Sequence, residues 1–89
     1  MKHATQAALD RLEPLLREVR KRTALKENSR GAFYHRSRAL LHFHEHGDGF
    51  FADLKTNHDF ERFPATTQKD WKALLKKLDR VLADGIPVR

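Results

Sequence analysis

The residue types best suited to chemistry are two histidines with one residue between them, His42 and His44, followed along the chain by Asp53. Residues two apart in a strand project from the same face, so both imidazoles would share one surface. Two imidazoles and a carboxylate are ligands that zinc, iron and manganese accept. Such a site also needs further ligands and supporting groups, which a short pattern does not reveal. The pattern therefore leaves two interpretations open, a divalent-metal site and a plain histidine–aspartate pair on a wet surface.

Catalysis by the same histidines would require a nucleophile nearby, and the sequence offers none in a recognisable setting. Ser37 falls on the opposite face by alternation and lacks the flanking glycines of a nucleophile elbow. The chain has no cysteine, which excludes disulfides and thiolate chemistry. Its four glycines are accounted for by turns and a helix end, with no phosphate-binding loop among them. We therefore expect a protein that is not an enzyme and uses no cofactor.

The histidine pair lies in segment 33–55, FYHRSRALLHFHEHGDGFFADLK, in which polar and apolar residues alternate. Alternation with period two predicts strands that have one buried face. Odd positions in the first half are mostly apolar, and Leu40 is an apolar exception among the even positions. We expect the polar face to be the binding face, made by Tyr34, Arg36, Arg38, His42, His44, Phe51 and Asp53.

A glycine–aspartate pair at 47–48 divides this segment and predicts a two-residue hairpin turn, because glycine accepts a positive φ without strain. With that turn, Phe43 faces Ala52 on the apolar side of the hairpin. On the polar side, His42 faces Asp53. A shift of one residue would mix the two faces, so the pattern specifies this register.

Helical periodicity precedes the strands. Apolar residues at three- and four-residue spacing predict a helix over residues 5–27. A proline inside a helix costs about 3 kcal/mol or more. We therefore expect a break or kink near Leu12–Glu13, with Pro14 opening a second helical piece.

A third strand is predicted over residues 58–63, and the clearest helix of the chain follows it. Thr67 and Asp70 resemble a capping box at the start of that helix, and Gly85 with Pro87 marks its end. This order predicts an α+β fold, with a three-stranded antiparallel sheet and an N-terminal and a C-terminal helix packed on one face.

The chain has 89 residues, of which 39% are hydrophobic and 34% charged. This length suits a single α+β domain over residues 1–89, too short for two cores. No apolar run approaches the ~20 residues that a membrane span requires, and the start of the chain lacks the apolar segment of a signal peptide. We therefore expect a soluble cytoplasmic protein with no membrane partner.

The formal net charge of +6 is concentrated in segment 17–38, which holds eight cations and two acids. Positive charge gathered in this way would attract nucleic acid or another anionic partner. A solvated surface with cations near a helix C-terminus explains the same pattern. Tyrosine, phenylalanine and arginine on the polar strand face are also favoured at protein interfaces, which points to a homodimer as a further interpretation.

The strand segment followed by DFERF resembles a family of small bacterial proteins of unknown function. The shared features are a phenylalanine, arginine-rich positions, the sequence LHFH, an ADL segment and an ERF motif. The resemblance covers the central half of the chain and implies a compact bacterial α+β domain. It implies no activity, cofactor or catalytic residue.

The leading interpretation is a non-enzymatic domain of unknown cellular role that uses its Arg/His sheet face for self-association or partner binding. The first alternative is a divalent-metal-binding protein that uses His42, His44 and Asp53. The second alternative is a module that binds nucleic acid or another anion through the basic segment 17–38.

Overall fold

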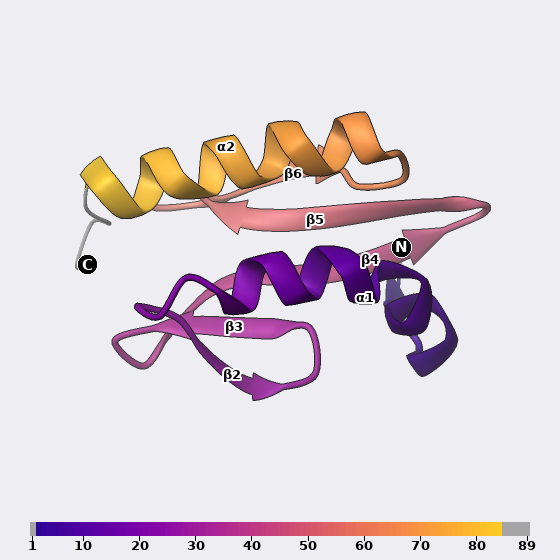
Figure 1. Ribbon diagram of the computed structural model, residues 1–89, viewed down its shortest axis with the longest axis horizontal. Coiled ribbons are helices and arrows are strands. Elements are labelled where there is room, and N and C mark those ends of the chain that lie inside the picture. Colours follow the sequence, from indigo (N-terminus) through magenta and orange to yellow (C-terminus); the bar gives the residue numbers. More distant parts are fainter. Residues whose placement is uncertain (1, 85–89) are drawn as a thin grey trace.

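The computed structural model describes residues 2–84, which form an antiparallel sheet and two helices (Figure 1). The sheet has six strands, ordered β2-β3-β4-β5-β6, and the short β1 pairs with β4 beside this path. The α+β class is thus confirmed, whereas the prediction of three strands is wrong. In chain order the elements are β1 (Lys2–His3), α1 (Gln6–Arg20), β2 (Lys26–Ser29), β3 (Ala32–His35), β4 (Arg38–His46), β5 (Gly49–Lys55), β6 (Phe60–Pro64) and α2 (Gln68–Asp84).

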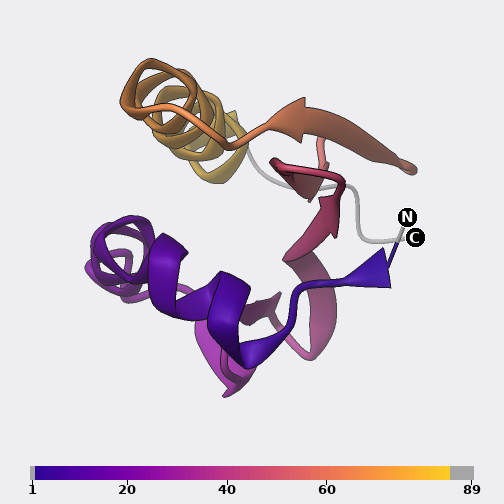
Figure 2. The ribbon, with the colours of Figure 1, turned by 90° about the vertical axis from the view of Figure 1, so that its right-hand side faces the viewer.

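Both helices lie on the same side of the sheet, as Figure 2 shows. Their apolar stripes meet the apolar strand face in one buried cluster. Burial of a leucine side chain stabilises a fold by about 1.5–3 kcal/mol, so this cluster is the main source of stability. Its largest side chains that are less than 2% exposed are Leu12, Leu15, Leu16, Val19, Phe33, Leu40, Leu41, Leu54, Leu74 and Leu78.

The predicted hairpin register is confirmed in β4 and β5. Phe43 pairs with Ala52 on the helix side, and His42 pairs with Asp53 on the other face. Gly47 has φ +59, as the first position of a two-residue type II′ turn requires. A side chain at this position would have open space around it, so glycine is needed for its backbone conformation alone.

The predicted helix over residues 5–27 is too long. The helix α1 ends at Arg20, and Lys26–Ser29 forms the edge strand β2 instead. Pairing with β3 and a turn at Gly31, whose φ is +80, overrides the local helical pattern. Pro14 does not end the helix, although Figure 2 shows the first turns of α1 inclined to the rest.

The first part of the polar segment is two strands, not one. A turn at Arg36-Ser37 separates β3 from β4, and both residues have a positive φ, of 52° and 68°. Two left-handed residues define a type I′ turn, which favours asparagine and glycine. Neither arginine nor serine signals such a turn, so the sequence pattern did not reveal it.

Leu40, the exception to alternation, lies at a β-bulge. Phe33 pairs with Leu41 and Tyr34 pairs with Ala39, so Leu40 is the extra residue of β4. A bulge lets two consecutive side chains approach the same side of a sheet. Leu40 and Leu41 are accordingly both 1% exposed and both belong to the core.

The predicted third strand exists as β6, which begins at Phe60 and extends to Pro64. The capping box is confirmed, since Asp70 N donates to Thr67 Oγ1 and Asp70 Oδ2 accepts from Thr67 N. The predicted stop at Gly85 and Pro87 lies outside the described residues.

We predict that Ser37→Gly stabilises the fold by about 0.5–1 kcal/mol, because it removes a side chain from a left-handed conformation that costs L-residues roughly 1–2 kcal/mol. Urea denaturation measures the change. Ser29→Gly in β2 is the matched control. It should lower the stability of the fold, because residue 29 lies in a strand, where glycine is unfavourable. A less stable Ser37→Gly protein would contradict the assignment of strain to this turn.

Candidate metal centre

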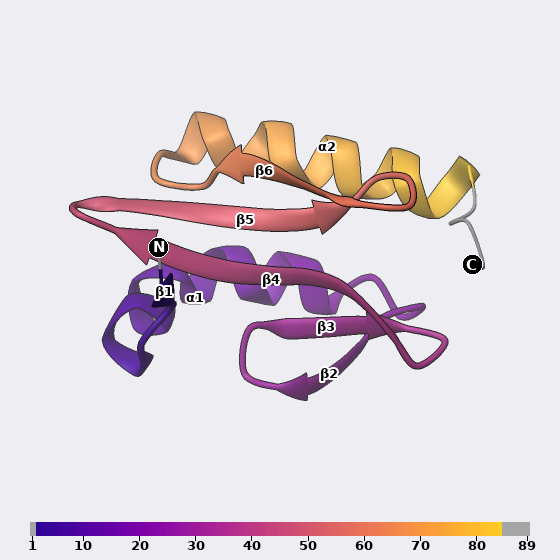
Figure 3. The ribbon, with the colours of Figure 1, turned by 180° about the vertical axis from the view of Figure 1, so that it is seen from behind.

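The sheet face away from the helices carries the histidine pair, and Figure 3 views the molecule from this side. We call it the outer face. The strand β4 is central to it, because β5 pairs along one edge while β3 and β1 both pair along the other. The outer face therefore receives side chains from segments far apart in the sequence.

The strand β1 brings a third histidine to the pair. His3 pairs with His44 in register. The backbone after it is anchored to β4, since Ala4 N donates to the Phe43 carbonyl at 3.1 Å and Thr5 N donates to Glu45 Oε2 at 2.7 Å. Sequence reasoning missed His3, because a two-residue strand has no periodicity to detect.

The three imidazoles form a compact cluster. The ring of His44 lies 4.7 Å from that of His3 and 4.9 Å from that of His42, measured between centroids. One ring nitrogen from each of the three lies within 4.8 Å of the other two. We call His3, His42 and His44 the His cluster.

The carboxylate of Asp53 lies beside His44 and restricts the orientation of its ring. Arg62 on β6 donates to Asp53 through Nε at 2.8 Å and through a terminal nitrogen at 2.9 Å. These hydrogen bonds lower the pKa of Asp53, so the carboxylate is ionised at neutral pH. His44 Nε2 lies 3.0 Å from Asp53 Oδ2.

This arrangement determines which nitrogen of His44 carries the proton. An ionised carboxylate only accepts hydrogen bonds, so the neighbouring Asp53 favours the tautomer in which His44 carries its proton on Nε2. His42 Nδ1 also lies 3.0 Å from His44 Nε2 and can only share that proton as an acceptor. In neutral His44 the lone pair is therefore on Nδ1.

That lone pair has no partner among residues 2–84. His44 Nδ1 is buried, no described residue forms a hydrogen bond with it, and the side chain of His44 is 10% exposed. A buried polar atom without a partner costs about 1–3 kcal/mol, and such atoms are rare in folded proteins. A neutral imidazole nitrogen is also a common metal ligand.

The candidate metal-binding residues in the structure differ in one member from those predicted from the sequence. Asp53 faces His42 in the register, as predicted, but its carboxylate binds Arg62 and His44 instead. Asp53 therefore serves to orient a histidine, and His3 takes its place beside the pair. Histidine ligands usually donate their second ring nitrogen to a carboxylate in this way.

The spacing of the His cluster is close to that of a metal site. Zinc–nitrogen bonds of about 2.1 Å require two ligands of one ion to lie within about 4.2 Å of each other. One ring nitrogen of each histidine, either Nδ1 or Nε2, lies within 4.8 Å of the other two, so such a set of nitrogens must approach by less than 1 Å to share an ion. His3 is exposed, which gives its ring room to move.

The environment of His42 favours the uncharged form that binds metals. Burial, followed by the neighbouring His44, lowers the pKa of His42. The ring of Phe60 contacts it edge-on at 4.9 Å between centroids. His42 is therefore neutral over a wider range of pH than an isolated histidine.

Only part of the predicted binding face is assembled. Tyr34 follows the core-facing Phe33 along β3 and therefore lies on the outer face. Its register partner Ala39 on β4 lies on the same face. Arg36 lies in the turn, and Arg38 pairs with His35 on the side opposite Tyr34. The bulge at Leu40 and the turn at Arg36-Ser37 interrupt the predicted alternation of the two faces. Arg36 and Arg38 therefore do not lie beside the histidines as predicted.

Phe51 does lie on the predicted face, because its register partners are His44 on β4 and Pro64 on β6. It is partly exposed. Of the seven residues of the predicted face, five therefore share the outer face, and Arg62 joins them from β6. No pattern within β6 identified Arg62 as the partner of Asp53.

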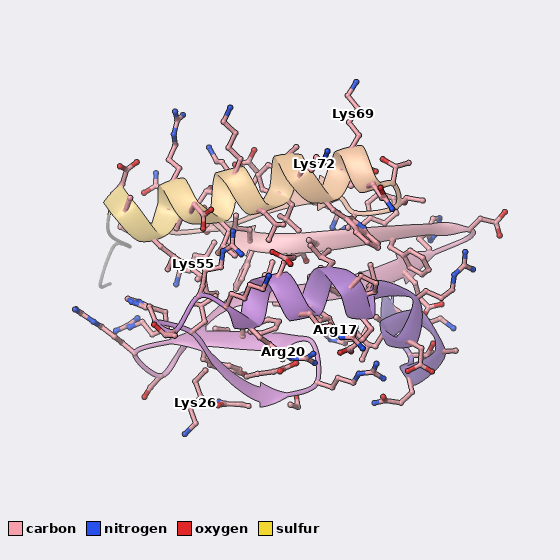
Figure 4. The ribbon with its side chains drawn as sticks, viewed as in Figure 1. Arg17, Arg20, Lys26, Lys55, Lys69 and Lys72 are labelled. Carbon is pink, nitrogen blue, oxygen red and sulfur yellow. The ribbon has the colours of Figure 1, made fainter. Side chains whose placement is uncertain are left out.

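The basic segment 17–38 is largely neutralised by ion pairs within the fold. Figure 4 views the molecule from the helix side and labels two of its cations on α1. Five of the eight cations have carboxylate partners among the described residues, which lowers the charge that they offer to an anionic partner. The pairs are Arg17 and Arg20 with Glu13, Arg20 with Glu27, Lys21 with Glu18, Arg22 with Asp79, and Arg30 with Asp10 and Glu13.

Comparison with known proteins finds no match for this chain among protein-family models, curated proteins or solved structures. The resemblance of the strand segment to a bacterial family therefore stays an expectation. Neither helix of the described residues is both long and apolar enough to cross a membrane.

We predict that Glu13→Gln lowers the thermal unfolding temperature at pH 7. Hydrogen bonds from Arg20 and Arg30 lower the pKa of Glu13 to about 2 from an ordinary value of 4.5. A lowered folded-state pKa stabilises the fold above pH 4.5, and this contribution is lost as the pH falls through 2. The difference between variant and wild type should therefore shrink between pH 4.5 and pH 2, as circular dichroism would measure.

Asp48→Asn is the charge-matched control, because Asp48 makes no ion pair with any described residue and is exposed. It should leave the unfolding temperature almost unchanged at pH 7. A Glu13→Gln effect of the same size at pH 7 and pH 2 would show that ionisation of Glu13 is not its cause.

Proposed function

We propose that this protein binds one divalent transition-metal ion through His3, His42 and His44. The observation that carries the proposal is the buried Nδ1 of His44, which has no partner within residues 2–84, while Nε2 lies 3.0 Å from Asp53. Metal coordination would satisfy that atom. The ionised Asp53, itself held by Arg62, would keep the ring in the tautomer that presents Nδ1.

The donor set favours zinc over the ions that prefer oxygen. Three imidazoles are ligands of zinc, copper, iron and nickel, whereas magnesium and calcium select carboxylate and carbonyl oxygens. A three-histidine set that leaves one position free is typical of zinc sites with an exchangeable ligand. The chemistry of the cluster thus supports zinc as the first ion to test.

Isothermal titration of the untagged protein with zinc at pH 7.5 tests the proposal. We expect one ion per chain, and we expect His3→Ala and His42→Ala each to weaken binding by at least about tenfold. Both side chains are more exposed than His44, so their removal spares the core.

His46→Ala is the matched control, since His46 is an exposed histidine of the same strand outside the His cluster. It should bind zinc as the wild type does. Equal affinities in His3→Ala, His42→Ala and His46→Ala, or no saturable binding by the wild type, would overturn the proposal. Far-UV circular dichroism verifies that each variant is folded.

Self-association through the outer face is a second candidate. Phe60 is 42% exposed and is the one large exposed hydrophobic side chain among residues 2–84. It lies on the face that neither helix covers, beside His42. Exposed aromatic side chains of this kind are favoured at interfaces between chains.

We predict that Phe60→Ser weakens any dimer measured by sedimentation equilibrium in the absence of zinc, because it removes the apolar contact that the outer face offers. Ala73→Ser on the exposed side of α2 is the control and should leave association unchanged. A wild type that sediments as a monomer at high concentration would dismiss this candidate without affecting the zinc experiment.

A further inference from the structure

We infer that an ion bound by the His cluster keeps one exchangeable coordination position, and that this position accepts a small anion such as a carboxylate. The inference rests on the proposed metal-binding function and specifies what the bound ion would exchange. Three features of the described residues carry it: the lack of a fourth protein ligand, a hollow beside the cluster and the charge that the ion would retain.

No fourth protein ligand is at hand within residues 2–84. The His cluster contains three members, and no further histidine, aspartate or glutamate of the described chain joins it. The nearby carboxylate of Asp53 is already engaged, because its two oxygens accept two hydrogen bonds from Arg62 and its Oδ2 lies 3.0 Å from His44 Nε2. Zinc bound by three imidazoles therefore needs a fourth ligand from solution.

The pairing of β4 leaves space for such a ligand. On one edge of β4, β1 pairs with His44 and Glu45, while β3 pairs with Arg38–Leu41. His42 lies between these two pairings. A surface hollow of about 360 Å³ opens there, and His3 and His42 line it.

The third histidine lies outside the hollow. His44 is buried in the sheet and does not line the hollow. An ion held by all three rings would thus have protein on the side of His44 and open space on the side of His3 and His42. The free coordination position would point into the hollow.

The hollow suits an anion. Three neutral imidazoles leave the full double charge on a zinc ion, which attracts a negative ligand. The lining contains no aspartate or glutamate that would repel one. Ser29 and Tyr34, whose hydroxyl groups can donate hydrogen bonds, line it together with the apolar Phe33 and Leu41. Two alanines, Ala32 and Ala39, keep the hollow from being filled by protein.

Cobalt(II) titration tests this inference, because the visible spectrum of cobalt reports the number and geometry of its ligands. The untagged protein is loaded with one equivalent of cobalt at pH 7.5 and titrated with acetate and, separately, with azide. We expect a saturable change in the visible bands with each anion, at a stoichiometry of one.

Ala32→Leu is the diagnostic variant, because a larger side chain at this position fills the hollow without replacing a histidine. We expect the cobalt spectrum to persist and the affinity for acetate to fall at least about tenfold. Ala73→Leu, on the exposed side of α2, is the matched control and should respond to acetate as the wild type does.

The outcomes separate this inference from the function on which it rests. A cobalt spectrum that neither anion changes would mean a closed coordination sphere and would overturn the inference while leaving metal binding intact. Equal acetate responses in Ala32→Leu and wild type would also overturn it, because the anion would then not enter the hollow. The absence of any cobalt spectrum would remove the metal site and the inference together.

Discussion

The register between β4 and β5 is the constraint on which the rest of the structure depends. Phe43 opposite Ala52 and His42 opposite Asp53 assign one set of side chains to the core and the other to the outer face. A slip by one residue would bury the histidines and expose the apolar set. Because β1 pairs with the other edge of β4, the assignment of His44 to the outer face also places its register partner His3 there.

The outer face is organised around one buried charge. Asp53 is 7% exposed, and a carboxylate in that position is tolerated because Arg62 holds it with two hydrogen bonds. The same carboxylate binds Nε2 of His44 and leaves Nδ1 as an unpartnered acceptor in the sheet. Asp53, which the local pattern marks as a ligand, thus lies against His44 and restricts its orientation instead. The cost of the unpartnered nitrogen is the physical argument behind the proposed metal site.

The distribution of cations illustrates how folding changes the meaning of a charge pattern. Segment 17–38 carries the whole net charge of the chain, which predicts an anionic partner when only the sequence is considered. In the fold, Glu13 accepts hydrogen bonds from both Arg20 and Arg30, and Arg22 donates to Asp79 on α2. These contacts tie α1 to its neighbours and use the cations for intramolecular pairing. Charge density along a chain therefore overstates the field that the folded protein offers to a partner.

Local patterns determined a definite part of this protein. The glycine at position 47 and the alternation around it were enough to predict the hairpin, its register and the pairing of His42 with Asp53. The capping box and the apolar stripe of α2 likewise depend on residues within a few positions of one another. Each of these features arises from interactions between near neighbours, and such interactions leave a periodic record in the sequence.

Tertiary structure alone decided the composition of the candidate site. The left-handed turn at Arg36-Ser37 forms without typical turn residues, and together with the bulge at Leu40 it removed two arginines from the predicted face. His3 reaches the histidine pair from the first strand of the chain, and Arg62 reaches Asp53 from the last strand. Contacts between segments so distant leave no local pattern, because they follow from the order in which strands pair around β4. The sequence by itself thus determined the histidine pair and the face that it shares with Asp53, and the pairing of distant strands decided which groups surround it.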